Sequence, residues 1–363
     1  MSMRLPRVPM RRSAAKLAPY AAPLEGRAGK LRLDFNENTG GCSPAVLRAL
    51  KKLTAEQIAI YPEYEAATKR IARFFNVRPA EMLLTNGVDD ALHVLMDTFV
   101  EPGSEVVIVE PTFNMYRFYA QLAGARIRAL RYDIEMRREA DARFPQERVL
   151  QALKRNPRAL LIANPNNPTG TLVTLRQIRA LLRAAPRTLL LVDEAYFEFS
   201  GVTVLPWIRR YPNLVVSRTF SKTAALAGLR LGCLFAAKET IAALKRCDSP
   251  YPVNTAALVA AEAVIRDPRS MRAYAEEIVR NRAPLMNHLE NLGTRVYPSA
   301  ANFLLVDLQE DATRMLKRLA RRGILLRDRS AEFGRKGFVR ISVGSAKQNV
   351  RLLRAIHEYK ESR

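Results

Sequence analysis

The sequence predicts an α/β protein in which a mainly parallel sheet lies between helices and a smaller α+β domain follows. Helical patterns alternate with short apolar runs through most of the chain, which favours βαβ units. Beyond about residue 250 the composition changes to long charged helices. The chain has 363 residues, 48% of them hydrophobic, which is enough for one large domain and a smaller companion.

The alternating elements come in the order that a parallel sheet requires. Residues 45–53 and 65–75 have amphipathic spacing and are predicted helices. Four short apolar runs are typical of buried strands, at residues 105–109, 160–163, 189–192 and 214–217. Ligands of open α/β sheets collect beyond the carboxyl ends of the strands. The polar residues that follow these runs are therefore candidates for a functional site.

The region after residue 250 is predicted to form the smaller domain. We expect long helices at residues 256–266 and 271–292, followed by strands near 302–306 and 338–343. The start of the chain is a basic, proline-containing arm that we expect to pack on that domain or on a partner subunit. The predicted divisions are an arm at 1–35, a large domain at 36–250 and a small domain at 251–363.

The composition argues against several classes of protein. The longest apolar runs are far shorter than the ~20 residues that span a bilayer, and no leader-type apolar stretch follows the basic start. We therefore expect a soluble protein with the cytoplasm as its default compartment. Cys42, Cys233 and Cys247 form no CxxC pair, and the histidines are scattered, so neither a disulfide framework nor a metal site is expected.

The formal net charge of +24 is the unusual global property of the chain. Such a charge is consistent with nucleic-acid binding through an arm at residues 4–16, with an anionic substrate, or with an arginine-rich composition that has no further meaning. The arginines are spread along the chain and are not gathered with aromatic residues in one module. This distribution is the weaker pattern for nucleic-acid recognition.

Three of the predicted strands are followed by residues suited to catalysis. Lys222 comes shortly after the strand at 214–217, with Arg230 eight residues later. Asp193 directly follows 189–192, with Tyr196 three positions on, and Asn167 lies in the NPNNPTG turn after 160–163. Each is unremarkable alone, since a lysine is usually a solvated charge, an aspartate can cap a helix and such a turn can be only a turn. A lysine after a buried strand, among small residues, is suited to Schiff-base chemistry.

Together and in this order, these motifs resemble fold-type-I pyridoxal-phosphate aminotransferases, and the individual strings resemble the histidinol-phosphate aminotransferase branch. The resemblance covers nearly the whole chain, with NEN at 36–38, YP at 61–62, TNG at 85–87, PTF at 111–113, NPNNPTG at 164–170, DEAY at 193–196, SKTAALAGLRLG at 221–232 and VRISVG at 339–344. It implies the type I fold with a seven-stranded type of sheet, pyridoxal 5'-phosphate as cofactor and a homodimer.

The resemblance also implies roles for individual residues. Lys222 holds the cofactor covalently and then moves a proton between the substrate α-carbon and the cofactor. Asp193 faces the pyridine nitrogen and keeps it protonated. Asn167 and Tyr196 donate hydrogen bonds to the phenolic oxygen of the ring, and Phe113 stacks on the ring, although a core aromatic is the plainer interpretation of its apolar side chain.

The phosphate group of the cofactor requires several donors. The resemblance assigns them to the start of the helix expected at residues 90–99 and to the lysine loop, namely Gly87, Val88, Asp89, Thr219, Ser221 and Arg230. In relatives a tyrosine at the position of Tyr61 reaches this phosphate from the neighbouring subunit. Packing in the core of its own chain is the alternative for Tyr61.

The substrate positions that the resemblance implies are Tyr20, Asn38, Arg327 and Arg340. Two arginines suit a phosphorylated amine, and the leading reaction is histidinol phosphate with 2-oxoglutarate giving imidazole acetol phosphate and glutamate, a step of histidine biosynthesis. Residues 39–42 read TGGC where the branch usually has proline, an aromatic residue, glycine and proline. Because this loop borders the substrate, phenylalanine or tyrosine transamination and threonine-phosphate decarboxylation remain alternatives.

The sequence agrees less well with three other classes of function. A basic nucleic-acid-binding protein would show steep salt dependence of binding. A structural homologue that has lost its cofactor is disfavoured because the expected cofactor residues are all present. A nicotinamide-dependent Rossmann enzyme is disfavoured because no GxGxxG turn follows a predicted strand.

Overall fold

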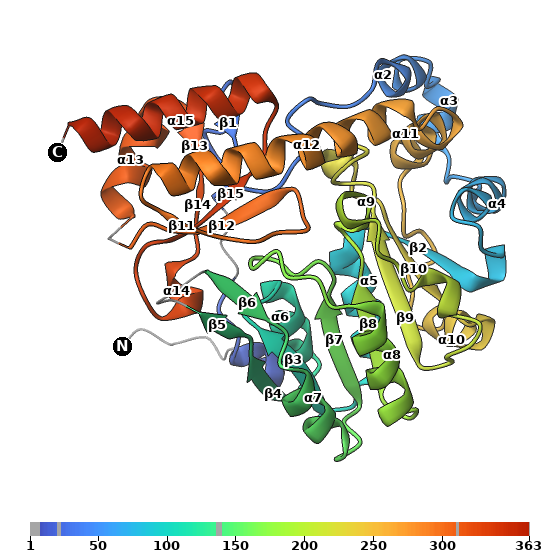
Figure 1. Ribbon diagram of the computed structural model, residues 1–363. Helices are drawn as coiled ribbons and strands as arrows, with labels where there is room; N and C mark the ends of the chain where they lie inside the picture. The colour runs from blue at the N-terminus through green and yellow to red at the C-terminus, as the bar shows by residue number, and fades with distance from the viewer. Residues whose placement is uncertain (1–7, 20–22, 136–139, 310–311, 363) are drawn as a thin grey trace, which may run out of the picture.

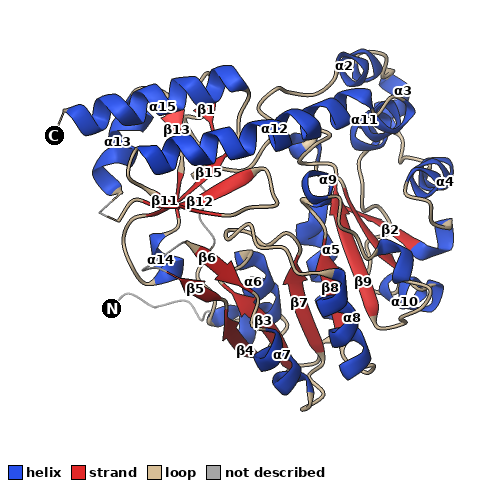
Figure 2. Ribbon diagram, viewed as in Figure 1, coloured by secondary structure: helices blue, strands red, loops and turns tan. Residues whose placement is uncertain are grey.

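The computed structural model describes residues 8–19, 23–135, 140–309 and 312–362. Its centre is a seven-stranded sheet in the order β2-β10-β9-β8-β7-β3-β4 (Figures 1 and 2). The strands are β2 (Met82–Thr85), β3 (Glu105–Glu110), β4 (Arg126–Arg131), β7 (Ala159–Ala163), β8 (Leu189–Asp193), β9 (Leu214–Thr219) and β10 (Gly232–Ala236). β10 runs antiparallel to both of its neighbours, and the other pairings are parallel. The predicted α/β class and mainly parallel sheet are confirmed.

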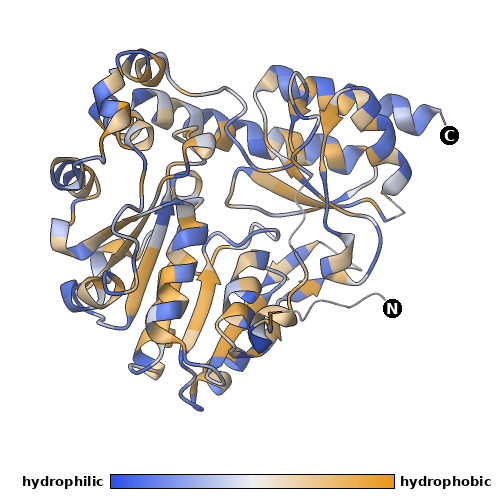
Figure 3. Cartoon of the chain, turned by 180° about the vertical axis from the view of Figure 1, so that it is seen from behind, coloured by the Kyte–Doolittle hydropathy of each residue, from blue (hydrophilic) through white to orange (hydrophobic). Residues whose placement is uncertain are grey.

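Helices cover both faces of this sheet because its inner strands are apolar on both sides. In β7, Leu160 and Ile162 join one hydrophobic cluster and Leu161 joins the other, as the two-residue period of a strand requires. The first face is covered by α2 (Pro44–Leu50), α4 (Tyr64–Phe74), α7 (Gln146–Leu153), α8 (Leu175–Ala184) and α11 (Thr255–Arg266). The second is covered by α5 (Gly87–Phe99), α6 (Asn114–Leu122) and α10 (Lys238–Leu244). Figure 3 shows the apolar strands between these helices.

A second, four-stranded sheet of order β11-β12-β15-β14 is antiparallel and has its own core. Its strands are β11 (Arg295–Tyr297), β12 (Phe303–Asp307), β14 (Arg327–Asp328) and β15 (Phe338–Ser342). Packed against it are α12 (Arg269–Asn291), α13 (Thr313–Arg321) and α15 (Ala346–Glu361). The start of the chain joins this unit, since β1 (Leu31–Arg32) pairs with β13 (Ile324–Leu325) and Leu33 is fully buried in the same core.

The remaining elements are short. They are α1 (Arg12–Ala15), α3 (Ala55–Ala59), α9 (Phe197–Ser200), α14 (Ser330–Phe333), the hairpin of β5 (Asp133–Glu135) and β6 (Asp141–Arg143), and 3-10 helices at Pro79–Glu81, Leu205–Trp207 and Ala227–Leu229. Of the helices described, none is long and apolar enough to cross a membrane. In the same part of the chain, no three Cys, His, Asp or Glu side chains gather in a way that could hold a metal ion.

The division of the chain between residues 250 and 251 stays a prediction. The packing favours a division further along, because Ala257, Leu258 and Ala261 of α11 belong to the core of the large sheet. Along α12 the packing changes: Met271 contacts that core, whereas Tyr274 and the residues after it belong to the core of the small domain. A boundary near the start of α12 would therefore follow the two cores.

Candidate active site

The carboxyl ends of the central strands open into a cavity of about 260 Å³. Its walls come from the ends of β7, β8 and β9, from the start of α5, and from the small-domain region around β14 and β15. Most residues predicted for the site line this cavity, namely Val88, Asp89, Phe113, Asn167, Asp193, Tyr196, Thr219, Ser221, Lys222, Arg230, Arg327 and Arg340. Side chains that are far apart in the sequence thus meet at one edge of the sheet, where ligands of α/β proteins bind.

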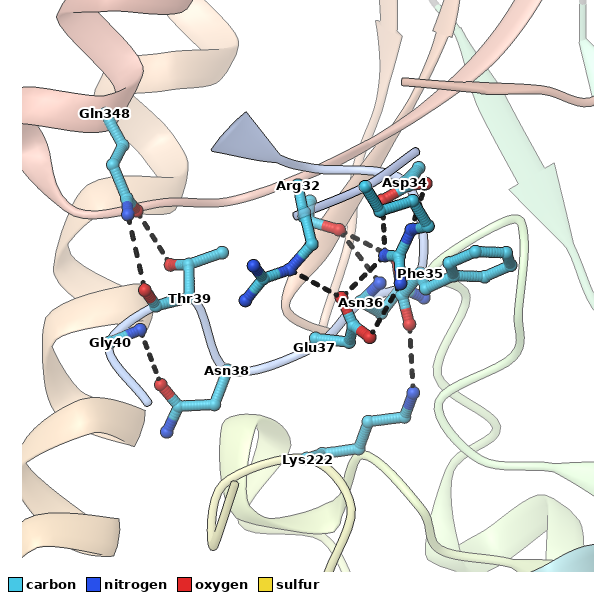
Figure 4. Close-up of polar contacts among 12 residues, drawn as sticks. Arg32, Asp34, Phe35, Asn36, Glu37, Asn38, Thr39, Gly40, Lys222 and Gln348 are labelled. Carbon is cyan, nitrogen blue, oxygen red and sulfur yellow. Dashed lines mark hydrogen bonds and ion pairs between the residues drawn. The ribbon is translucent and has the colours of Figure 1, made fainter. Parts of the chain in front are cut away.

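Lys222 lies in the loop after β9 and lines the cavity with its side chain. Its Nζ donates a hydrogen bond to the carbonyl oxygen of Phe35 at 3.1 Å (Figure 4). The same nitrogen lies 5.7 Å from the centre of the Tyr196 ring. A backbone carbonyl is a neutral acceptor, so this contact positions the amine without forming an ion pair.

Asp193 is the last residue of β8, and its side chain is buried. Its Oδ1 accepts hydrogen bonds from Ser217 Oγ at 2.8 Å and from the amide of Ala195 at 3.2 Å, while Oδ2 accepts from Tyr116 Oη at 2.8 Å. Burial raises the pKa of the carboxyl, and these hydrogen bonds act in the opposite direction. A buried carboxylate of this kind is best stabilised by a cation inside the cavity.

Asn167 and Tyr196 each keep a donor that can face the cavity. Tyr196 Oη accepts a hydrogen bond from Asn36 Nδ2 at 3.0 Å, which leaves its hydroxyl hydrogen to be donated. Asn167 Oδ1 accepts from Arg340 Nη1 at 2.6 Å, which leaves its amide hydrogens to be donated. Both residues can therefore donate to one oxygen placed in the cavity.

The start of α5 and the loop after β9 form a concave anion site. Gly87 has a φ of +76°, and a Cβ there would lie 2.6 Å from Nη2 of Arg230, so glycine is what allows the guanidinium to approach. The same Nη2 donates to Asp89 Oδ2 at 3.0 Å. With the hydroxyls of Thr219 and Ser221 and the free amides of the first helical turn, this is the donor set that a phosphate group requires.

Three arginines at the edge of the small-domain sheet also line the cavity, and we call them the arginine cluster: Arg327, Arg329 and Arg340. Arg340 Nη2 donates to the carbonyl oxygen of Asp34 at 2.5 Å. Burial, reinforced by the neighbouring Arg329, lowers the pKa of Arg340 to about 9. Positive charge crowded in this way is relieved when an anion binds.

Residues 34–37, which we call the N-terminal strap, cross the cavity beside Lys222 (Figure 4). Arg27 fixes the strap from outside. Its guanidinium makes two hydrogen bonds with Asp34, at 2.9 and 3.1 Å, and two with Glu37, at 2.7 and 3.1 Å. It also lies 4.3 Å from the centre of the Phe35 ring. The strap in turn contacts Lys222 through the Phe35 carbonyl, so Arg27 acts on the cavity indirectly.

Three of the described residues predicted for the site stand outside the lining of the cavity. Gly87 contributes through its neighbours and its lack of a Cβ. Tyr61 is 71% exposed and stacks on Tyr251 with ring centres 4.1 Å apart. Asn38 Nδ2 donates to the carbonyl oxygen of Thr223 at 3.0 Å, and its Oδ1 accepts from the amide of residue 40. Tyr20 lies outside the described residues, as do residues 4–7 of the basic stretch 4–16.

Several residues of the site were not predicted from the sequence. Tyr116, the partner of Asp193, reads as an ordinary core position of an amphipathic helix, and nothing in the sequence distinguishes it. Arg329 had a usable signal, because it follows Arg327 by two residues and side chains two apart in a strand share a face. Phe35 lies next to the NEN string, but it is the last residue of the segment predicted as an arm and was therefore not considered part of the site.

Comparison with known proteins agrees with this geometry. The model of the family "Aminotransferase class I and II" matches residues 28–356. A histidinol-phosphate aminotransferase of Geobacillus sp. (strain WCH70) is 34% identical over 90% of this chain and 89% of its own length. That of Roseiflexus castenholzii is 38% identical over 96% and 97%.

A solved structure gives the same result at the level of the fold. The histidinol-phosphate aminotransferase of Sinorhizobium meliloti, in complex with pyridoxal-5'-phosphate, superposes with a TM-score of 0.85 at 25% identity, covering 97% of this chain and 98% of that one. The family model spans both domains and the whole cavity described above. This chain therefore belongs to the class I and II aminotransferases.

Proposed function

We propose that this protein transfers the amino group of histidinol phosphate to 2-oxoglutarate, with pyridoxal 5'-phosphate as its cofactor. One observation carries the proposal: a single cavity holds Lys222, the buried carboxylate of Asp193, a phosphate-type donor set at α5 and the arginine cluster. The names of the relatives at 34% and 38% identity support the choice of histidinol phosphate. The reaction would yield imidazole acetol phosphate and glutamate, a step of histidine biosynthesis.

The residues present fit this cofactor. Asp193 is a buried carboxylate with a raised pKa, so its charged form would be stabilised by a cationic partner. A protonated pyridine nitrogen supplies such a partner. At the other end, the space left by the missing Cβ of Gly87 lies beside Arg230, where a phosphate group would be held together with Thr219 and Ser221. Asn167 and Tyr196 would donate to the ring oxygen, and Phe113 would lie against the ring.

When bound, the cofactor supplies an electrophilic carbon that captures amines and a protonated ring that accepts electrons from the substrate α-carbon. Lys222 would provide the amine that holds it and, once released, the base that removes the α-proton and returns a proton. The Phe35 carbonyl would keep the released amine inside the cavity, since it accepts from Nζ at 3.1 Å. Asp193 would hold the proton on the ring nitrogen, with Tyr116 and Ser217 fixing its two oxygens.

The substrate anion would bind at the arginine cluster. Arg340 and Arg327 are register partners on adjacent strands and therefore face the same side of the sheet. Histidinol phosphate has no α-carboxylate, so both arginines would be available for its phosphate group. We further propose that Asn38 and Tyr20 approach the remainder of the substrate.

We also propose a homodimer in the cytoplasm. Tyr61 is exposed on its own chain, and Tyr251, Ile58 and Ile60 are exposed as well. A patch of large apolar side chains on a surface is typical of an interface. In the dimer, Tyr61 would reach the phosphate site of the partner subunit.

A panel of amino donors tests the substrate assignment. Purified protein loaded with pyridoxal 5'-phosphate is incubated with 2-oxoglutarate and either histidinol phosphate, phenylalanine, tyrosine or threonine phosphate, and glutamate formation is measured. We expect kcat/KM for histidinol phosphate to exceed that for phenylalanine by about 100-fold or more, the order of gain expected when a buried arginine site is filled. If the protein prefers phenylalanine or tyrosine, the proposed substrate is wrong and that amino acid takes its place. If threonine phosphate releases carbon dioxide, the proposed reaction is wrong and the protein is a decarboxylase.

A further inference from the structure

A second cavity, of about 830 Å³, lies beside the ends of β8 and β9. Its walls come from α9, the start of α12, the segment after α4 and the 3-10 helix at Leu205–Trp207. Arg218 lines this cavity, whereas Thr219, the next residue of β9, lines the amino-transfer cavity, because successive side chains of a strand point to opposite faces. Within the described part of the chain, the two cavities share no lining residue.

The walls of the second cavity are largely apolar. They include Phe75, Val77, Phe197, Leu205, Ile208 and Met271. The volume lies in the range of about 300–1,000 Å³ that is typical of sites for small molecules, and such sites combine apolar walls with a few polar groups. The apolar part of a ligand with one or two rings would therefore find both space and contacts here.

Arg218 supplies a buried polar group in these walls. It is 6% exposed. Its Nε and Nη2 donate to Glu194 Oε2 at 3.0 and 2.8 Å, and Nη2 also donates to Thr203 Oγ1 at 2.7 Å. Its guanidinium lies 3.7 Å from the centre of the Phe197 ring. These contacts fix the guanidinium, and among the described residues Nη1 has no acceptor, so one charged donor is left for a ligand that enters the cavity.

The other arginines of the second cavity lie toward its rim. Arg209 pairs with Glu81 at 2.7 Å, and Arg280 lies 3.8 Å from Glu276. Arg272 is exposed and has no ion-pair partner among the described residues. The cavity therefore keeps one cation that no carboxylate neutralises, which favours an anionic ligand.

Glu198 is the carboxyl group that lines the second cavity next to Phe197. Desolvation raises the pKa of Glu198 to about 7, and the nearby carboxylate of Glu194 acts in the same direction, whereas Arg218 opposes it. Near neutral pH this carboxyl is partly protonated, and a protonated carboxyl donates a hydrogen bond. It can therefore share a proton with the carboxylate of a ligand, whereas a dianion would exceed the charge of the cavity.

We propose that the second cavity binds a small monocarboxylate with an aromatic or aliphatic body. The carboxylate would accept hydrogen bonds from Arg218 Nη1 and from the Glu198 carboxyl, and the body would lie against the walls around Phe75 and Phe197. This site is independent of the proposed amino transfer, which uses no residue of the second cavity.

The test titrates the cofactor-loaded protein with naphthylacetate, which has a two-ring body, one carboxylate and neither an amine nor an oxo group. Calorimetry should show one molecule bound per chain with a dissociation constant below about 1 mM. The uncharged naphthylacetamide should bind roughly 10–100-fold more weakly, since it loses the charge-assisted hydrogen bond to Arg218. No binding of naphthylacetate, or equal binding of the two compounds, would overturn the proposal.

Substitutions locate the bound probe. Val279 is 40% exposed and lines the second cavity, so V279W should fill part of it from the rim and weaken naphthylacetate by about 10-fold or more. V350W, at an exposed valine of α15, is the matched control and should change nothing. E198Q, which cannot ionise, should tighten naphthylacetate by about 3-fold or more at pH 8 and leave naphthylacetamide unchanged, because a like charge is removed.

R327Q separates the two cavities, because Arg327 lines only the amino-transfer cavity. It should leave the binding of naphthylacetate unchanged. If R327Q weakens the probe and V279W does not, the probe occupies the amino-transfer cavity and the proposal is wrong. If naphthylacetate binds as expected but histidinol phosphate is not a substrate, the second site stands and the proposed function is wrong instead.

Discussion

At the scale of single residues, Asp193 lowers the stability of the cofactor-free protein and has a proposed role in the chemistry of the site. Its buried carboxylate has a raised pKa, so the charged form is costly in the protein without cofactor. A group whose pKa is raised on folding stabilises the fold below its unfolded pKa, and this contribution is lost as the pH rises through its folded pKa. Asp193 therefore lowers the stability of the cofactor-free protein most at neutral and alkaline pH.

D193N should consequently stabilise the cofactor-free protein while impairing catalysis. At pH 8 we expect its melting temperature to rise by about 1–2 °C, which is the shift that roughly 1 kcal/mol produces in a chain of 363 residues with an unfolding entropy of about 2.1 cal/mol/K per residue. The difference should shrink as the pH falls, because the raised pKa lets the carboxyl of the folded wild type take up its proton at a higher pH than an ordinary aspartate. Amino transfer should fall by about 100-fold or more, since the ring nitrogen loses its anionic partner. D97N, on an exposed carboxylate, is the matched control and should do neither.

How far the sequence could predict the site is also decided residue by residue. Lys222, Asp193 and Asn167 were predictable because each lies at or shortly after the end of a strongly apolar strand, at the ligand-binding edge. Tyr116 was not predictable, because it contacts Asp193 from a helix that is distant in the sequence, and its position in that helix has the pattern of an ordinary buried residue. Asn36 was visible only as part of a motif, and its hydrogen bond to Tyr196 joins residues 160 positions apart.

At the scale of elements, the N-terminal strap connects the arm to the cavity. The sequence predicted an arm that packs on the small domain or on a partner, and the residues from β1 onward pack in the small-domain core of the same chain. The sequence also left β2, β4 and β10 unassigned. The edge strand β4 mixes arginine with apolar residues and so lacks the continuous apolar pattern of an inner strand. β2 and β10 are short apolar runs, which periodicity alone does not distinguish from a buried helix segment.

R27Q should release the strap. Arg27 is 12% exposed and compensates Asp34, which is 6% exposed, so its loss leaves a buried carboxylate unpaired and should cost about 3 kcal/mol or more in denaturant unfolding. Because the strap also contacts Lys222 and Arg340, KM for the amine should rise.

The nearby R32Q provides the comparison. Arg32 is 38% exposed and contacts Glu37 at 3.4 Å, so its loss should cost no more than about 1 kcal/mol. Equal effects of the two substitutions on stability and KM would mean that the Arg27 pairs do not hold the strap.

At the scale of the whole molecule, the role proposed for Tyr61 requires a second copy of the chain. Tyr61 is on the surface of its own chain and contributes to the site only if a partner subunit brings it there. Active sites shared between subunits permit complementation between two inactive proteins.

K222A and Y61A should therefore restore activity when mixed and allowed to exchange subunits. In a heterodimer, one site carries both substitutions and the other carries neither. With equal amounts and random pairing, roughly a quarter of all sites should be intact, as expected for an isologous dimer. If Tyr61 served its own chain, every site would stay defective and no activity would return.

The central claim is that Lys222 carries the amino-transfer chemistry on pyridoxal 5'-phosphate, and an absorbance spectrum tests it most directly. The purified protein incubated with the cofactor should show a yellow band that disappears when histidinol phosphate is added without an acceptor. K222A should bind the cofactor without forming this band. A colourless wild-type protein that cannot take up the cofactor, or a K222A protein with the same band and the same bleaching, would contradict the account.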